Sequence, residues 1–136
     1  MIVCGIEMAA SEARLVILDG NRASYSHVNV APAKLQLADD EAAAEVRAFQ
    51  DAIYAFLREN HVELVVIKKR VKRGEYAGGP VGFKLEGILQ LYPDCEVSLV
   101  SPQSIAAAKR NHSPVTPQGC RQYQQTAFET AFTALD

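Results

Sequence analysis

Basic residues gather in one short part of the sequence, directly after an apolar run at positions 64–67. The cations of this part are Lys68, Lys69, Arg70, Lys72 and Arg73, with Lys84 further along. Gly78, Gly79 and Pro80 lie between Arg73 and Lys84. Basic side chains and the backbone N–H groups at the start of a helix are the protein groups that bind phosphate oxygens. The spacing therefore predicts an anion site built from these cations, the glycine turn and a helix that begins at Pro80.

The charge of the chain is uneven. Residues 68–84 carry a net charge of +5, whereas the whole chain carries −2, so the remainder carries −7. Such polarity concerns partners and association rates rather than fold. A basic loop can also be a solvated surface or can bind the acidic face of a protein. Two interpretations stay open: nucleic acid or another phosphate-bearing ligand, and a protein partner or a second copy of the chain.

The first part of the sequence predicts three antiparallel strands. Residues 1–8 form a short apolar run with Glu7 near its end, and residues 14–18 and 23–30 flank Asp19-Gly20-Asn21, which favours a tight turn. Residues 30–40 are expected to form a connector. A helix is expected over residues 39–61, capped by Asp39 or Asp40, because its apolar residues recur at helical spacing.

The second part of the sequence alternates between strands and helices. Residues 62–68 have the unbroken apolar centre of a strand buried on both faces. Pro80 and Pro93 bound a helix, residues 95–102 form a fifth strand, and Ser101 caps the next helix. A C-terminal helix is expected to open at Thr116 and Pro117 and to bury Phe128, Phe132 and Leu135. This order predicts a single α/β domain over residues 1–136, with a mixed five-stranded sheet and helices on its faces.

The composition excludes several classes of protein. No segment approaches the roughly 20 apolar residues of a membrane span, and the N-terminus lacks the basic residues of a signal peptide, so we expect a cytoplasmic protein without a membrane partner. Three scattered cysteines match neither a disulfide framework nor a zinc site, and the three histidines lack the spacing of metal ligands. We expect no resident cofactor or metal.

The element order resembles the ribonuclease H-like fold, and in particular its Holliday-junction resolvases. The segment "CGIE" is similar to their first-strand pattern, in which an acid stands at the position of Glu7, and "FKLEGIL" is similar to a run in one of their helices. The whole chain resembles more closely a small bacterial family, the domain-of-unknown-function family numbered 3010. The segments "VCGIE", "VVIKKR", "AGGPVGFKLEGI" and "VSLVSP" carry that resemblance. It implies the fold and supplies no mechanism.

The resemblance to nucleases is incomplete at the residues that would hold metal. Two-metal nucleases of this superfamily need acids on the first strand, the fourth strand and the last helix, which hold two divalent ions about 4 Å apart. Here the fourth strand ends in Lys68, and the last helix offers Glu129 as its internal acid. A divalent-metal-dependent nuclease would use Glu7 with Glu86 or Glu129; otherwise Glu7 is expected to pair with Lys68. The sequence favours a binding protein over an enzyme.

Overall fold

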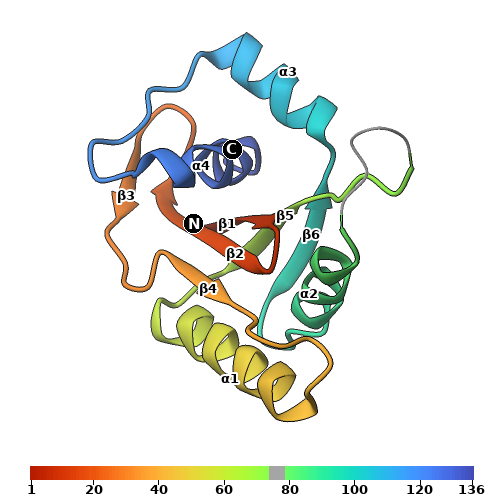
Figure 1. Ribbon diagram of the computed structural model, residues 1–136. Helices are drawn as coiled ribbons and strands as arrows, with labels where there is room; N and C mark the ends of the chain where they lie inside the picture. The colour runs from red at the N-terminus through yellow and green to blue at the C-terminus, as the bar shows by residue number, and fades with distance from the viewer. Residues whose placement is uncertain (74–78) are drawn as a thin grey trace.

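A mixed β-sheet separates two layers of helices (Figure 1). The computed structural model describes residues 1–73 and 79–136. The strands of these residues are β1 (Ile2–Ala9), β2 (Glu12–Gly20), β3 (Tyr25–Val28), β4 (Lys34–Gln36), β5 (Leu64–Lys68) and β6 (Glu96–Val100). The helices are α1 (Ala43–Glu59), α2 (Pro80–Gln90), α3 (Pro102–His112) and α4 (Gln125–Thr133), and a 3-10 turn, η1 (Gln122–Gln124), precedes α4.

The pairing of the strands confirms the predicted mixed sheet. The strand order is β3-β2-β1-β5-β6, in which β1, β2 and β3 are antiparallel and β5 runs parallel to both β1 and β6. Strand β4 also pairs with β2, so the segment predicted as a connector contains a short strand. Pro32, which has no N–H for a ladder, lies between β3 and β4. The third strand of the sheet is therefore divided into two pieces.

Two predicted helix starts are wrong, and two are confirmed, those of α2 and α3. Helix α2 begins at Pro80, as predicted. Neither Asp39 nor Asp40 caps α1, which begins after Ala42 without a side-chain cap. The Asp39 carboxylate instead accepts from the backbone N of Glu41 in the preceding turn, at 3.0 Å. Thr116 and Pro117 do not open a helix, since α4 begins at Gln125. Ser101 does cap α3, as predicted: its Oγ accepts from the backbone N of Ser104 at 3.1 Å.

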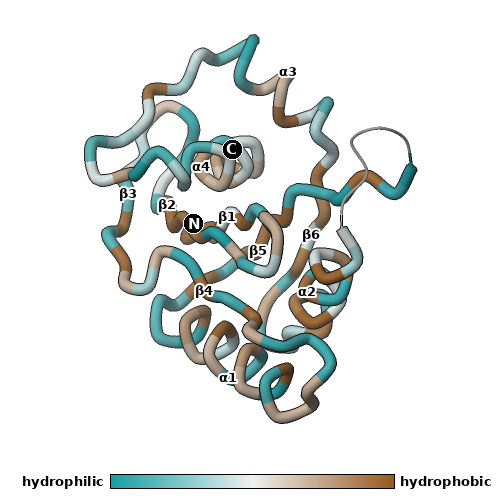
Figure 2. Tube along the Cα trace, viewed as in Figure 1, coloured by the Kyte–Doolittle hydropathy of each residue, from teal (hydrophilic) through white to brown (hydrophobic). Residues whose placement is uncertain are grey.

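Each face of the sheet has its own core. Helices α1 and α2 cover the face that presents Cys4 and Ile6, and α4 covers the face that presents Val3 and Val66 (Figure 1). The strand centres are apolar, whereas the chain just after β5 is mostly hydrophilic (Figure 2). None of the helices in the described part of the chain is both long and apolar enough to cross a membrane.

Helix α4 approaches β1 at Gly5 more closely than any side chain would allow. A Cβ at Gly5 would lie 2.3 Å from the carbonyl oxygen of Ala127 and 2.5 Å from the backbone N of Ala131. The glycine of "CGIE" therefore serves helix–sheet packing, two positions before Glu7. Its absent side chain sets the depth at which α4 lies on the sheet.

Candidate anion-binding site

The basic segment leaves the sheet at the edge where two parallel strands end. Strands β5 and β6 are parallel neighbours, with Lys68 paired to Val100. The backbone N of Lys69 donates to the carbonyl oxygen of Val100 at 2.8 Å, which ties the segment to the end of β6. The carboxyl edge of parallel strands is where ligands usually bind in open α/β sheets.

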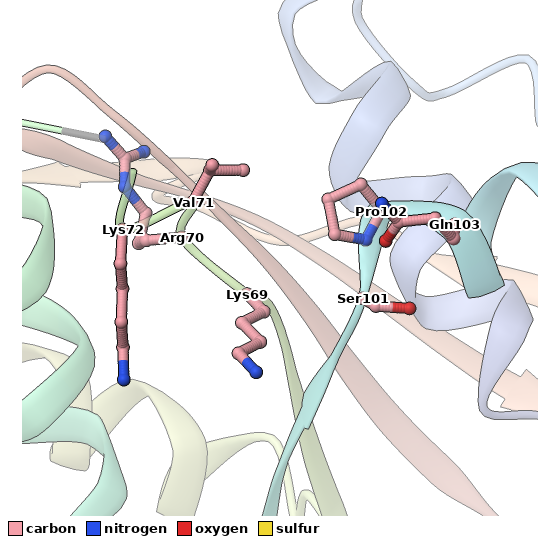
Figure 3. Close-up of a pocket in the computed structure, with 7 residues that line it drawn as sticks. All are labelled: Lys69, Arg70, Val71, Lys72, Ser101, Pro102 and Gln103. Atoms are coloured by element: carbon pink, nitrogen blue, oxygen red, sulfur yellow. The ribbon is translucent and has the colours of Figure 1, made fainter. Parts of the chain in front are cut away.

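A cavity of about 270 Å³ lies between the basic segment and the start of α3. Its walls are Lys69, Arg70, Val71 and Lys72 on one side and Ser101, Pro102 and Gln103 on the other. Figure 3 shows these two groups of side chains, one from the chain that continues past β5 and one from the first turn of α3. The cavity brings cations of the basic segment to the amino end of a helix.

The first turn of α3 adds partial positive charge to this cavity. Pro102 has no N–H, and the N–H of Ser104 is bonded to the Ser101 hydroxyl. Within residues 1–73 and 79–136, the N–H of Gln103 has no hydrogen-bond partner. A helix amino end carries roughly half an elementary positive charge, concentrated on such N–H groups. The residues that line the cavity therefore include basic side chains and the positively polarised first turn of α3.

The cations of the basic segment differ in their partners. Lys69, Lys72 and Arg73 are exposed, and no carboxylate of the described residues lies within ion-pair distance of them. Arg70 is half-buried and donates from Nη1 to the carbonyl oxygen of Met8. We call the exposed cations, together with residues 101–103, the basic edge.

Two of the predicted anion ligands lie elsewhere. Lys68 belongs to the sheet face that α4 covers, because it alternates with Ile67, which packs on the opposite face. Lys84 donates from Nζ to the carbonyl oxygen of Asp40 at 2.7 Å and lies 3.4 Å from its carboxylate. Gly79 is the exposed residue before α2, and Gly78 lies outside the described residues. The helix start that lines the cavity is that of α3, not the predicted start of α2 at Pro80.

The acids around Glu7 are paired with cations. Glu7 Oε1 lies 3.6 Å from Nη1 of Arg14, its partner across β1 and β2, and Arg14 Nε also contacts Glu12 at 3.3 Å. Among the described residues, Arg14 is the cation within ion-pair distance of Glu7. The predicted pair between Glu7 and Lys68 is therefore wrong. The antiparallel register of β1 and β2 places Arg14 directly opposite Glu7.

The other candidate acids are also occupied and lie on different elements. Glu129 on α4 pairs with Nζ of Lys109 on α3 at 2.9 Å, and the buried carboxylate of Glu86 on α2 accepts from the backbone N of Arg70 at 3.3 Å. We call Glu7–Arg14 and Glu129–Lys109 the acid pairs. Across residues 1–73 and 79–136, no three His, Cys, Asp or Glu side chains form a group that could hold a metal ion.

The cysteines are not set up as nucleophiles. Burial raises the pKa of the Cys4 thiol far above its usual value, and the nearby Cys95 raises it further. Burial likewise raises the pKa of Cys95 and of Cys120. These side chains are thiols at neutral pH, and only the thiolate is a strong nucleophile.

Comparison with known proteins assigns the chain to a family. Residues 1–134 match the model of the family described as "Protein of unknown function (DUF3010)". The chain belongs to this family. A search of curated proteins found no match.

Solved structures show which fold this family member has. Thermus thermophilus RuvC matches with a TM-score of 0.70 at 15% identity, covering 98% of this chain and 92% of RuvC. The same protein in complex with a Holliday junction substrate gives 0.68 at 14% identity, covering 98% and 91%. The Fowlpox virus resolvase bound to Holliday junction DNA gives 0.53 at 13% identity, with the same coverage. The fold is ribonuclease H-like, as the sequence predicts.

Sequence reasoning missed the second wall of the cavity. The sequence predicts Ser101, Pro102 and Gln103 as the cap and first turn of a helix, and that prediction is confirmed. Their place beside the basic segment depends on strand order. If residues 64–68 and 96–100 are adjacent parallel strands, then the residues after each strand must meet at one edge of the sheet. That signal is present in the sequence, in two apolar runs that each lead into polar residues.

Proposed function

We propose that this protein binds nucleic acid, or another ligand that carries phosphates, at the basic edge. The observation that carries the proposal is the cavity between residues 69–72 and 101–103, which is lined both by residues of the basic segment and by the first turn of α3. Anions bind such places because the charge and the N–H groups need no rearrangement to meet a phosphate. Two fold neighbours, RuvC and the Fowlpox virus resolvase, form complexes with Holliday junctions, which makes branched DNA the first ligand to test.

The acids support a binding role rather than metal-dependent cleavage. A two-metal site needs several carboxylates that converge on the ions. In the described residues Glu7 and Glu129 are each bonded to a cation, and Glu86 lies on α2, on the other side of the sheet from α4. Two metal ions could bind only if Glu7 and Glu129 gave up their cation partners and the acids moved together. We propose that the metal-binding arrangement of the fold is degenerate in this chain.

Salt dependence gives the first test of the proposal. Fluorescent single-stranded, double-stranded and four-way-junction DNA and RNA would be titrated at several salt concentrations, with inorganic phosphate as a competitor. Each phosphate that the protein neutralises releases counterions, so affinity is expected to fall steeply as salt rises. Competition by phosphate without binding of any oligonucleotide would identify a smaller phosphate-bearing ligand. Absence of binding by both at low salt would overturn the proposal.

A matched pair of double variants locates the binding site. Lys69→Ser with Lys72→Ser removes two cations from the cavity, and Arg47→Ser with Lys34→Ser removes two exposed cations from α1 and β4. The first variant is expected to lower affinity by roughly 10- to 100-fold and the salt slope by about 2, since each phosphate contact contributes about 1. The control variant changes net charge equally and is expected to bind almost as wild type. Equal losses in both would show that binding depends on net charge, not on the basic edge.

Cleavage of the bound oligonucleotides would be monitored in the same samples with manganese or magnesium added. A metal-dependent product that disappears in Glu7→Ala would replace the binding role with the nuclease alternative. Binding without cleavage would leave the proposal in place.

A further inference from the structure

Arg70 contacts the rest of the molecule in a way that its basic neighbours do not. Its Nη1 donates to the carbonyl oxygen of Met8, near the end of β1, and its backbone N donates to Oε2 of Glu86 on α2 at 3.3 Å. Lys69 and Lys72 on either side of it are exposed and make no such side-chain bonds within the described residues. Arg70 therefore connects the basic segment to β1 and to α2 at once.

Gly82 on α2 makes room for the guanidinium of Arg70. A Cβ at Gly82 would lie 2.8 Å from both Cζ and Nε of Arg70 and 3.0 Å from Nη2. These distances are well below the roughly 3.5–4.0 Å of a favourable contact between heavy atoms. The guanidinium thus rests directly on the helix backbone. Gly87, on the same helix, would meet nothing within 4 Å if it carried a Cβ.

The arrangement is not explained by stability alone. Nε of Arg70 is buried and has no hydrogen-bond partner among the described residues. An N–H buried without a partner costs free energy, and an apolar side chain in this place would avoid that cost. A planar, rigid side chain that both packs flat and donates at its tip is instead suited to fixing the path of a chain.

We propose that Arg70 is a positioning residue for the cavity. Its guanidinium, placed against Gly82 and bonded to the Met8 carbonyl, fixes the course of the chain after β5 and so holds Lys69 and Lys72 at the wall of the cavity that the start of α3 also lines. The bond from Lys69 N to the Val100 carbonyl fixes the chain one residue earlier. This inference rests on the proposed function and adds that one of the clustered cations acts through the chain's path, without itself contacting phosphate.

Two alanine substitutions on the same helix provide a matched test. Gly82→Ala and Gly87→Ala each add one methyl group to α2 and leave every charge in place. Gly82→Ala is expected to weaken binding of the four-way-junction DNA roughly tenfold, the factor that corresponds to about one charge-assisted contact. Gly87→Ala is expected to bind as wild type. Equal affinity in both variants would overturn the inference.

Arg70 variants separate positioning from direct contact. Arg70→Lys keeps the charge but loses the planar group, so a positioning role predicts a loss of affinity close to that of Gly82→Ala. In the Arg70→Ala background, Gly82→Ala is expected to have no further effect, because the group it displaces is gone. If Arg70→Lys binds as wild type, or if the two losses add, then Arg70 contacts the ligand directly and the inference is wrong.

Amide hydrogen exchange tests the same contact without any ligand. The N–H groups of Lys69 and Arg70 are expected to exchange several-fold faster in Gly82→Ala than in wild type, and at the wild-type rate in Gly87→Ala. Faster exchange in a protein that binds none of the oligonucleotides would refute the proposed function while supporting the fixed path. Unchanged exchange in Gly82→Ala would refute the fixed path itself. If Gly82→Ala does not fold, Arg70→Lys supplies both readouts.

Discussion

The acid pairs and the basic edge differ in whether their charged side chains have ion-pair partners. Glu7 and Glu129 each lie against a cation from a neighbouring element, at 3.6 and 2.9 Å. At the basic edge, Lys69, Lys72 and Arg73 have no carboxylate of the described residues within ion-pair distance. The acid pairs are therefore neutralised within the molecule, whereas no carboxylate of the described residues neutralises the cations of the basic edge.

This difference separates charge that is paired inside the fold from charge that is exposed at the edge of the sheet. A ribonuclease H-like sheet gathers the residues after its parallel strands at one edge, whatever those residues are. Acids there would attract metal ions, and the metal ions would attract phosphates. Cations there attract phosphates directly. The fold supplies the place, and the side chains at the strand ends decide which of the two chemistries is available.

The largest expected effect concerns the packing beneath the acid pairs. Gly5→Ala places a methyl group into the backbone of α4, so the helix must move away from the sheet, at a cost of about 3 kcal/mol in the free energy of unfolding. Urea unfolding measures this loss. Gly87→Ala, which meets open space, is the control and is expected to stabilise α2 by about 0.5–1 kcal/mol.

The same variant sharpens the comparison. Affinity of the folded Gly5→Ala protein for junction DNA is expected to stay close to wild type, because α4 does not line the cavity. A parallel loss of affinity and stability would show that the basic edge depends on the α4 layer.

Two adjacent lysines allow an intermediate effect to be measured. Lys69→Ser removes a cation from the cavity and is expected to lower affinity roughly tenfold and the salt slope by about 1. Lys68→Ser removes the same charge one residue away, on the α4 face, and is expected to change affinity by less than about threefold through long-range attraction alone. A larger loss in Lys68→Ser, measured by fluorescence anisotropy, would move the ligand to the acid pairs and break the comparison.

The smallest expected effect concerns the pair between α3 and α4. Glu129→Gln leaves Lys109 without its partner, and pairs with one exposed member contribute about 0.5–1 kcal/mol, so unfolding in urea should shift by no more than that. Affinity is expected to be unchanged or slightly higher, because a negative charge is lost. A Glu129→Gln variant that loses metal-dependent cleavage would instead make the acid pairs an active centre. Lys109→Met is the matched control, because it breaks the same ion pair but keeps the carboxylate of Glu129.

The sequence predicts the fold well because the apolar patterns are long. The runs that form β1, β5 and β6, and the helical spacing of α1, fix both the element order and the faces that become buried. The errors concern short polar residues that make a hydrogen bond other than the predicted helix cap. Asp39 accepts from an N–H in a turn before the helix instead of capping α1. Thr116 bonds from Oγ1 to the side chain of Gln125 and does not start a helix.

The sequence shows which cations gather in the candidate site, but not which contacts each of them makes. Composition shows a basic run, yet it does not show that Arg70 rests on Gly82 or that Lys84 reaches Asp40, since both contacts join residues far apart in the chain. Arg14 could not be identified as the partner of Glu7 either, because that pair depends on the register of a hairpin. These contacts join single side chains that are far apart in the sequence, and the spacing of apolar residues does not predict them.

The close contact of α4 with β1 has a consequence for how the protein is made. The apolar side chains Val3, Val16, Leu18 and Val66 receive their cover from residues 125–133, which leave the ribosome long after β1 does. Until then one face of the growing sheet is open to water and to other chains, the condition in which nascent proteins associate wrongly or recruit chaperones. Because β1 packs against α4, the core layer under α1 and α2 can close earlier in synthesis than the layer under α4.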